Sequence, residues 1–139
     1  MPSQLMPPDY RPLDDEEFMN PVMKEYFRQK LLSWRAELLH EFAETLQSLQ
    51  QGGLQDPDFA DRASAETDRS LELRTRDRER KLITKIDDAL ERINDNSYGY
   101  CEETGDPIGV RRLEARPIAT LSLEAQERHE RMERTQRDE

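Results

Sequence analysis

The fold is decided by the stretch FRQKLLSWRAELLHEFAETLQSL, which spans residues 27–49. Its large apolar residues recur every three or four positions and therefore share one face of a helix. They are Phe27, Leu31, Trp34, Leu38, Phe42, Leu46 and Leu49. The pattern predicts a helix from about Asn20 to Gln51, which the pair Gly52 and Gly53 ends.

A second helix is expected soon after the first. Asp56 suits its N-cap and Pro57 its first helical position, where a missing N–H is no loss. It runs to about Asn94, with an apolar seam at Leu82, Ile86, Leu90 and Ile93. Two long helices joined by a short turn lie antiparallel. The sequence therefore predicts a mainly α-helical chain with a long coiled-coil hairpin at residues 19–97 and its tip near residues 52–62.

The segments that flank the hairpin differ from it in character. Residues 1–18 are proline-rich at their start and predict an extended segment, with an acidic run at 13–18 where a helix N-terminus favours negative charge. Residues 98–121 predict a small turn-rich globular unit, with a short β-hairpin at 107–112. A very polar C-terminal helix is expected at 122–139.

Composition limits the classes of protein to consider. With 34% hydrophobic and 37% charged residues, a narrow seam between helices is more plausible than a large spherical core. The net charge of -10 argues against general nucleic-acid binding and direct DNA recognition, but leaves room for a local basic patch. No stretch suits a membrane span or a signal peptide, and one cysteine favours a reducing, cytoplasmic setting. Catalytic motifs are also missing from the sequence, which predicts a protein that is not an enzyme.

The single cysteine begins what resembles half of a zinc knuckle. In a C-x2-C-x15-20-C-x2-C frame that starts at Cys101, the other positions hold Thr104, Ser122 and Ala125. Hydroxyls are poor zinc ligands and alanine is none, so the sequence predicts a degenerate zinc-finger-like unit without metal. Ser122 is then free to cap the last helix, whereas Cys101 is either a small buried residue or a redox-sensitive thiol.

Three polar segments each allow a structural and a functional reading. The acids at the hairpin tip, Asp56, Asp58 and Asp61, either cap a helix or carry carboxylates to a distant site. The segment RTRDRERK, residues 74–81, has two readings. One is a solvated face whose arginine stems cover the partner helix, with ion pairs Glu72–Arg76 and Asp77–Lys81. The other is a contact surface for an anionic partner.

The third segment is GVRRLEARP, residues 109–117. Its arginines Arg111, Arg112 and Arg116 either keep the surface soluble or bind phosphate.

Three segments together resemble the bacterial DksA/TraR family of transcription regulators. They are LELRTRDRERKLITKI at 71–86, YGYCE at 98–102 and IGVRRLEARP at 108–117. The likeness extends from about residue 17 to the C-terminal helix. It implies a regulator that places its hairpin in the secondary channel of RNA polymerase and modulates promoter open complexes, often with the alarmone ppGpp in the stringent response.

The resemblance also implies roles for particular residues. The family's tip pattern D-x-x-D-x-A matches Asp58, Asp61 and Ala63, and its polymerase-contacting arginines match Arg74 and Arg78. The residues that correspond to its ppGpp site are Leu82, Lys85 and Arg116.

This sequence departs from the family pattern at two places. Gln126 stands where a lysine of the last helix usually helps to hold ppGpp. The four zinc cysteines correspond to Cys101, Thr104, Ser122 and Ala125, so the chain resembles the cysteine-poor, zinc-independent type of the family. The alternatives to such a regulator are a Gre-type transcript-cleavage factor and a coiled-coil adaptor without a polymerase role. A third, a zinc-dependent nucleic-acid binder, is disfavoured by the net charge and the missing ligands.

Overall fold

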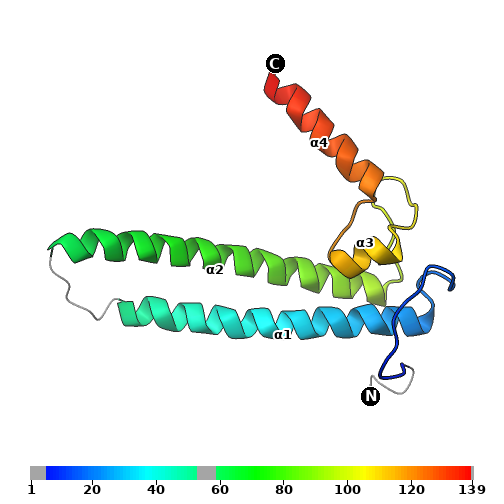
Figure 1. Ribbon diagram of the computed structural model, residues 1–139, viewed down its shortest axis with the longest axis horizontal. Coiled ribbons are helices and arrows are strands. Elements are labelled where there is room, and N and C mark those ends of the chain that lie inside the picture. Colours follow the sequence, from blue (N-terminus) through cyan, green and yellow to red (C-terminus); the bar gives the residue numbers. More distant parts are fainter. Residues whose placement is uncertain (1–5, 53–58, 139) are drawn as a thin grey trace. The chain divides into compact units, whose positions relative to one another are not determined.

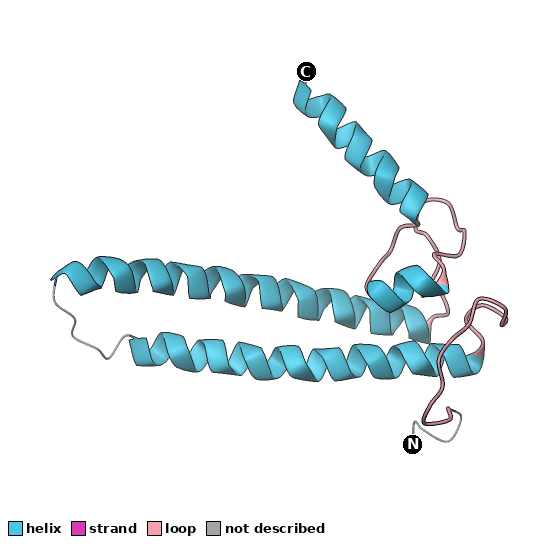
Figure 2. Cartoon of the chain, in the orientation of Figure 1, coloured by secondary structure: helices cyan, strands magenta, loops and turns pink. Residues whose placement is uncertain are grey.

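The structure of the chain is a computed structural model that describes residues 6–52 and 59–138, with the backbone alone at 49, 51–52, 59–65 and 137–138. The described residues form four helices (Figure 1), namely α1 (Pro21–Gly52), α2 (Phe59–Asn94), α3 (Val110–Ala115) and α4 (Leu123–Asp138). They contain no β-strand (Figure 2), which confirms the mainly helical fold. Across these ranges, no helix has an apolar stretch sufficient to cross a membrane.

One local prediction about the turn-rich unit was wrong. Residues 110–115 form helix α3 and not the second strand of a hairpin at 107–112. Val110 and Leu113 are buried, and this contact stabilises a helix too short to persist by its own propensity. Only an isolated antiparallel bridge between Tyr100 and Pro107 precedes it.

The start of α1 also differs from expectation. The acidic run at 13–18 lies before the helix, and the first turn of α1 contains no acid. Asn20 caps the helix instead, because its Oδ1 accepts a hydrogen bond of 2.9 Å from the Met23 N–H. Glu16 of the acidic run accepts a 2.9 Å bond from the Tyr10 hydroxyl and so orders the preceding turn.

The chain divides into two compact units. Unit 1 consists of Met1–Leu31 and Asp88–Glu139, and unit 2 consists of Leu32–Asp87. Helices α1 and α2 each contribute to both units.

Unit 2 is an antiparallel pair of helices. Arg35 Nε lies 2.6 Å from Asp87 Oδ1, and further along α1 the Ser48 hydroxyl donates to Glu72 Oε1 at 3.0 Å. As the residue numbers rise on α1 they fall on α2, which is the pairing that the two apolar seams predict. Leu38 is buried at this interface. The coiled-coil hairpin is thus confirmed within this unit.

Unit 1 holds most of the buried apolar side chains of the described residues. From α1 and α2 these are Met23, Phe27, Leu31, Ala89 and Ile93, and from the turn-rich unit and α4 they are Tyr98, Cys101, Ile108, Val110, Leu113, Ile118, Ala119 and Ala125. Lys30 Nζ fastens α3 to α1 through Glu114, with bonds of 2.8 Å to Oε2 and 3.0 Å to the carbonyl oxygen. The turn-rich segment therefore shares the core of unit 1 with α1 and α2.

Gly99 lies where the chain turns from α2 into the turn-rich unit. Its φ of +92° is one that side chains other than glycine rarely adopt, and a Cβ there would lie 3.1 Å from the Phe18 ring. Its carbonyl accepts a 2.7 Å bond from the Ile108 N–H. Glycine is needed here for both backbone conformation and space.

Tyr98 provides a direct test of this packing. Its side chain is 1% exposed, its ring centroid lies 5.8 Å from that of Phe27, and its hydroxyl donates to the Pro117 carbonyl at 2.8 Å. We expect Tyr98→Phe to lower the free energy of unfolding by about 1–3 kcal/mol, because a buried carbonyl loses its partner. Chemical denaturation of the full chain measures this change.

The matched control is Tyr100→Phe, since Tyr100 is 37% exposed. This variant is expected to change the free energy of unfolding by less than about 0.5 kcal/mol. Equal effects of the two substitutions would contradict the role given to the buried hydroxyl.

Candidate functional site

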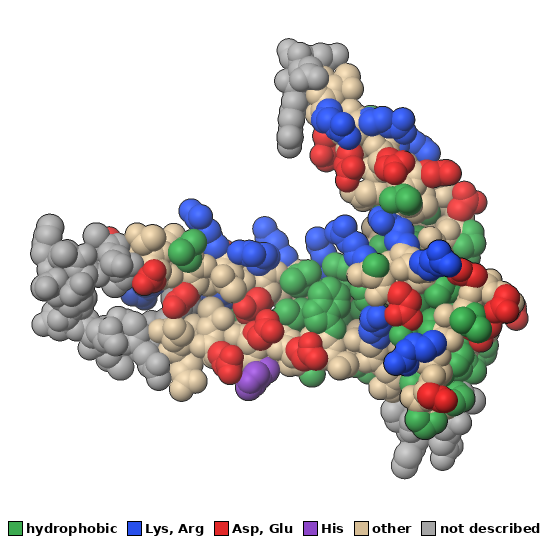
Figure 3. Space-filling view, viewed as in Figure 1, with side chains coloured by type: hydrophobic (Ala, Val, Ile, Leu, Met, Phe, Trp, Pro, Cys, Tyr) green, Lys and Arg blue, Asp and Glu red, His purple; other side chains and the backbone are tan. Residues whose placement is uncertain are grey.

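One face of α2 collects the basic residues that the sequence singled out. Arg74, Arg78, Leu82 and Lys85 follow one another at spacings of 4, 4 and 3, which places them on one face of the helix within unit 2. Leu82 is half-buried and the three cations are exposed. Figure 3 shows basic side chains along α2, with acidic side chains over the helix pair beside them.

The ion pairs expected within the segment 74–81 do not form. Neither Glu72–Arg76 nor Asp77–Lys81 is among the pairs within 4.0 Å in the described residues. Arg76 lies over the Phe42 ring instead, 5.6 Å from its centroid. The Arg76 side chain thus covers part of α1. The other cations of residues 74–81 have no acidic partner within 4.0 Å in the described residues.

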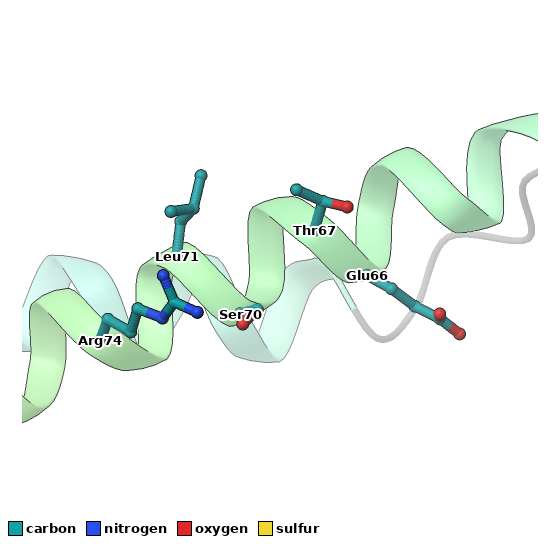
Figure 4. A pocket seen from close by; sticks show the side chains of 5 residues that line it. All are labelled: Glu66, Thr67, Ser70, Leu71 and Arg74. Carbon is teal, nitrogen blue, oxygen red and sulfur yellow. The ribbon is translucent and has the colours of Figure 1, made fainter.

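A shallow depression of about 460 Å³ lies beside Arg74. Glu66, Thr67, Ser70 and Leu71 line it with Arg74, all from α2. Figure 4 shows the Arg74 side chain extending along the helix toward Ser70 and Leu71. Leu71 is 53% exposed, so an apolar and a cationic side chain stand together on this surface.

The polar segment of α2 also contains a buried acid that sequence reasoning missed. Glu79 is 7% exposed, and its Oε1 receives only a long 3.5 Å bond from the Thr45 hydroxyl. Burial, and next the charge of Glu41, raise the pKa of its carboxyl. The sequence spacing could have indicated this burial. Glu79 lies three positions before Leu82 and therefore on the same face of α2 as the apolar seam.

The arginines of the turn-rich unit separate into different roles. Arg112 Nε donates to the Leu121 carbonyl at 2.9 Å and holds the chain before α4. Arg111 and Arg116 are exposed, and Arg111 Nε lies 3.7 Å from Asp14 Oδ2. These three arginines share a depression of about 470 Å³ with apolar side chains that include Leu123. Arg116 of the expected ppGpp set lies in unit 1, whereas Leu82 and Lys85 lie in unit 2.

The expected tip residues lie at the edge of what the structure describes. Asp56 and Asp58 fall outside the described residues. Asp61 and Ala63 lie in α2, but their side chains are also outside the description. Their roles therefore rest on the resemblance alone.

At the knuckle, each of the four frame positions has a structural task. Thr104 Oγ1 accepts a 3.2 Å bond from the Asp106 N–H and shapes the turn. Ser122 Oγ accepts a 3.2 Å bond from the Ala125 N–H, which confirms the predicted cap of α4. The Ala125 methyl group is fully buried, and Cys101 is 3% exposed.

The Cys101 thiol lies among hydrogen-bond donors. Burial raises its pKa, but hydrogen bonds from the Thr104 hydroxyl and from the backbone N–H groups of Ser122, Thr104 and Glu103 lower it to about 6. His129 of α4 pairs with Glu103 and adds a second link across the knuckle. Hydrogen bonds thus stabilise the one thiolate of the unit.

These positions do not fit zinc. One thiolate remains, two hydroxyls are engaged by backbone N–H groups, and the fourth position is a buried methyl group. Within residues 6–52 and 59–138, no group of three histidine, cysteine or acidic side chains is placed to hold a metal ion.

Two protein-family models match the chain. Residues 23–93 match the model described as "DnaK suppressor protein DksA, N-terminal domain", and residues 96–131 match "Prokaryotic dksA/traR C4-type zinc finger". The second match covers the knuckle even though its cysteine set is incomplete.

Similar proteins extend over nearly the whole chain. The RNA polymerase-binding transcription factor DksA of Caulobacter vibrioides is 66% identical over 94% of this chain and 92% of its own length. The protein of that name from Escherichia coli K12 is 46% identical over 83% of this chain and 76% of its own length.

Among solved structures, transcription factor DksA2 from Pseudomonas aeruginosa matches with a TM-score of 0.81 and 43% identity over 86% of this chain and 94% of that chain. The two family models together match residues 23–93 and 96–131, and the relatives named above cover most of the chain, so the chain belongs to the DksA/TraR family.

Proposed function

We propose that this chain is a transcription regulator that binds RNA polymerase. The observation that carries the proposal is 66% identity over 94% of the chain to a relative named for that activity. The exposed cations of α2 support it, because Arg74, Arg78 and Lys85 share a face and have no acid within 4.0 Å among the described residues. Such a face suits an acidic protein surface.

The finer mechanism follows the family resemblance. The hairpin enters the secondary channel, and Asp58 and Asp61 act near the polymerase active centre while Arg74 and Arg78 contact the enzyme. Leu82, Lys85 and Arg116 hold ppGpp at the contact with polymerase, with Gln126 in place of the usual lysine. The chain itself is a non-enzymatic regulator of the cytoplasm.

We also propose that the protein works without zinc. The support is the task that each knuckle residue already performs, namely the Thr104 turn, the Ser122 cap and the buried Ala125. The Tyr98 and Leu113 side chains supply apolar burial beside them.

Transcription in vitro tests the function. We expect the purified chain to change the output of purified polymerase from a ribosomal RNA promoter, with a larger effect when ppGpp is added. Unchanged output together with no polymerase binding would favour the coiled-coil adaptor. Robust RNA cleavage in stalled complexes would favour the Gre-type factor.

A substitution at the hairpin tip distinguishes an effect on transcription from an effect on polymerase binding. Asp61→Asn removes one charge and keeps the side-chain size, so we expect it to abolish the promoter effect while polymerase affinity changes less than about threefold. The promoter assay is read beside an equilibrium binding assay. A loss of binding as large as the loss of activity would make the tip an anchor.

Metal analysis tests the zinc-free knuckle. Protein purified from zinc-supplemented cells is expected to contain less than about 0.1 zinc per chain, and a chelator is expected to leave its melting temperature unchanged. The matched control carries Thr104→Cys, Ser122→Cys and Ala125→Cys together, which supplies the missing thiolates and is expected to gain zinc. Stoichiometric zinc in the unchanged chain would refute the proposal.

A further inference from the structure

Unit 2 contains an acidic groove between α1 and α2. It has a volume of about 410 Å³, and its lining includes Glu41, Glu44, Thr45, Ser48, Glu72 and Glu79. The first four come from α1 and the last two from α2. Carboxylates and hydroxyls on both walls make it a surface of hydrogen-bond acceptors.

No lysine or arginine of the described residues forms an ion pair with the acids of this groove. None of its carboxylates lies within 4.0 Å of a lysine or arginine nitrogen in the described residues. Glu72 accepts a hydrogen bond from the Ser48 hydroxyl, and Glu79 accepts a long one from the Thr45 hydroxyl. Glu44 Oε1 lies 3.1 Å from Nε2 of the exposed His40, which is a cation only when protonated. The acids therefore have polar neighbours but no fixed positive charge.

Glu79 shows most clearly that a donor is missing. The residue is 7% exposed, and its Oε2 has no hydrogen-bond partner. An ionised oxygen in such a place is costly unless a donor reaches it. The terminal torsion of glutamate rotates broadly, so either carboxylate oxygen can turn toward the groove.

The arginines nearest to Glu79 in sequence do not fill this role. Arg76 lies over the Phe42 ring, 5.6 Å from its centroid. The Arg78 charge opposes the rise in the Glu79 pKa, but burial and Glu41 outweigh it. Arg76 Nε is also buried without a hydrogen-bond partner, so neither arginine donates to Glu79 Oε2, and a donor from a partner protein can take that place.

The shape of the site favours a guanidinium over a metal ion. No three acidic, histidine or cysteine side chains in the described residues converge as metal ligands. The acceptors instead line two helices, and a planar guanidinium has five N–H donors that reach several acceptors at once.

We propose that the acidic groove accepts an arginine side chain of RNA polymerase, whose guanidinium donates to Glu79 and to acceptors of the α1 wall. The proposal rests on the proposed function and adds a contact of opposite charge to the basic face of α2. Complementary contacts of both signs fix the register of a partner more closely than contacts of one sign.

Equilibrium binding of full-length variants to purified RNA polymerase tests the contact. Glu79→Gln removes the charge and keeps an acceptor for Thr45, and we expect it to weaken binding about tenfold or more, because it removes one side of a buried charge pair. Glu41→Gln on the opposite wall is expected to weaken binding in the same direction.

The matched control is Asp77→Asn, which removes the same charge from an exposed position of α2 outside the groove. It is expected to change the affinity less than about twofold. Thermal melting of each variant checks the fold, and Glu79→Gln is expected to melt no lower than the unchanged chain because it relieves a buried charge.

Two results would overturn the groove contact while the proposed function stands. One is unchanged affinity of Glu79→Gln, and the other is an equal loss in Glu79→Gln and Asp77→Asn, which indicates long-range charge alone. Failure of the unchanged chain to bind polymerase would instead overturn the proposed function and the contact with it.

Discussion

The fold depends on one constraint, which is that a single narrow stripe on each long helix must hold the hairpin together. Only 34% of the residues are hydrophobic, so little apolar surface is left for unit 2 once the core of unit 1 is built. The α1–α2 interface there includes polar pairs such as Arg35–Asp87 and Ser48–Glu72. A helix pair joined in this way keeps many charges at its surface, and these charges are what a partner can recognise.

Unit 1 contains most of the buried apolar side chains of the described residues. Tyr98, Leu113 and Ala125 are buried where the knuckle meets the helices, and the Ser122 hydroxyl caps α4. Cys101 is buried in the same core, and the donors around its thiol outweigh burial and lower the pKa of that group. In the zinc-free protein that we propose, packing and hydrogen bonding replace the thiolates that surround zinc in a complete C4 unit.

The sequence was informative where a regular period governs the structure. The spacing of apolar residues predicted α1 within two residues at each end, and the C-x2-C frame located Ser122 as the cap of α4. It failed at α3, because burial of Val110 and Leu113 determines that helix and no local pattern does. It also missed Glu79, since an acid at a seam position reads as a surface residue until the facing helix is in place. Of the solvated-face reading, the arginine stem over the partner helix is confirmed where Arg76 lies over Phe42. The Glu72–Arg76 ion pair of that reading is absent from the described residues.

Photo-crosslinking from position 71 shows whether the charged surface of unit 2 faces RNA polymerase. Leu71 is 53% exposed and lines both the acidic groove and the depression beside Arg74. A chain with a photoreactive amino acid at position 71 is expected to crosslink efficiently to purified polymerase in the complex. A probe at Asp77, outside the groove and that depression, is predicted to crosslink weakly. Crosslinks from position 77 but not from position 71, in a chain that binds polymerase, would contradict the account.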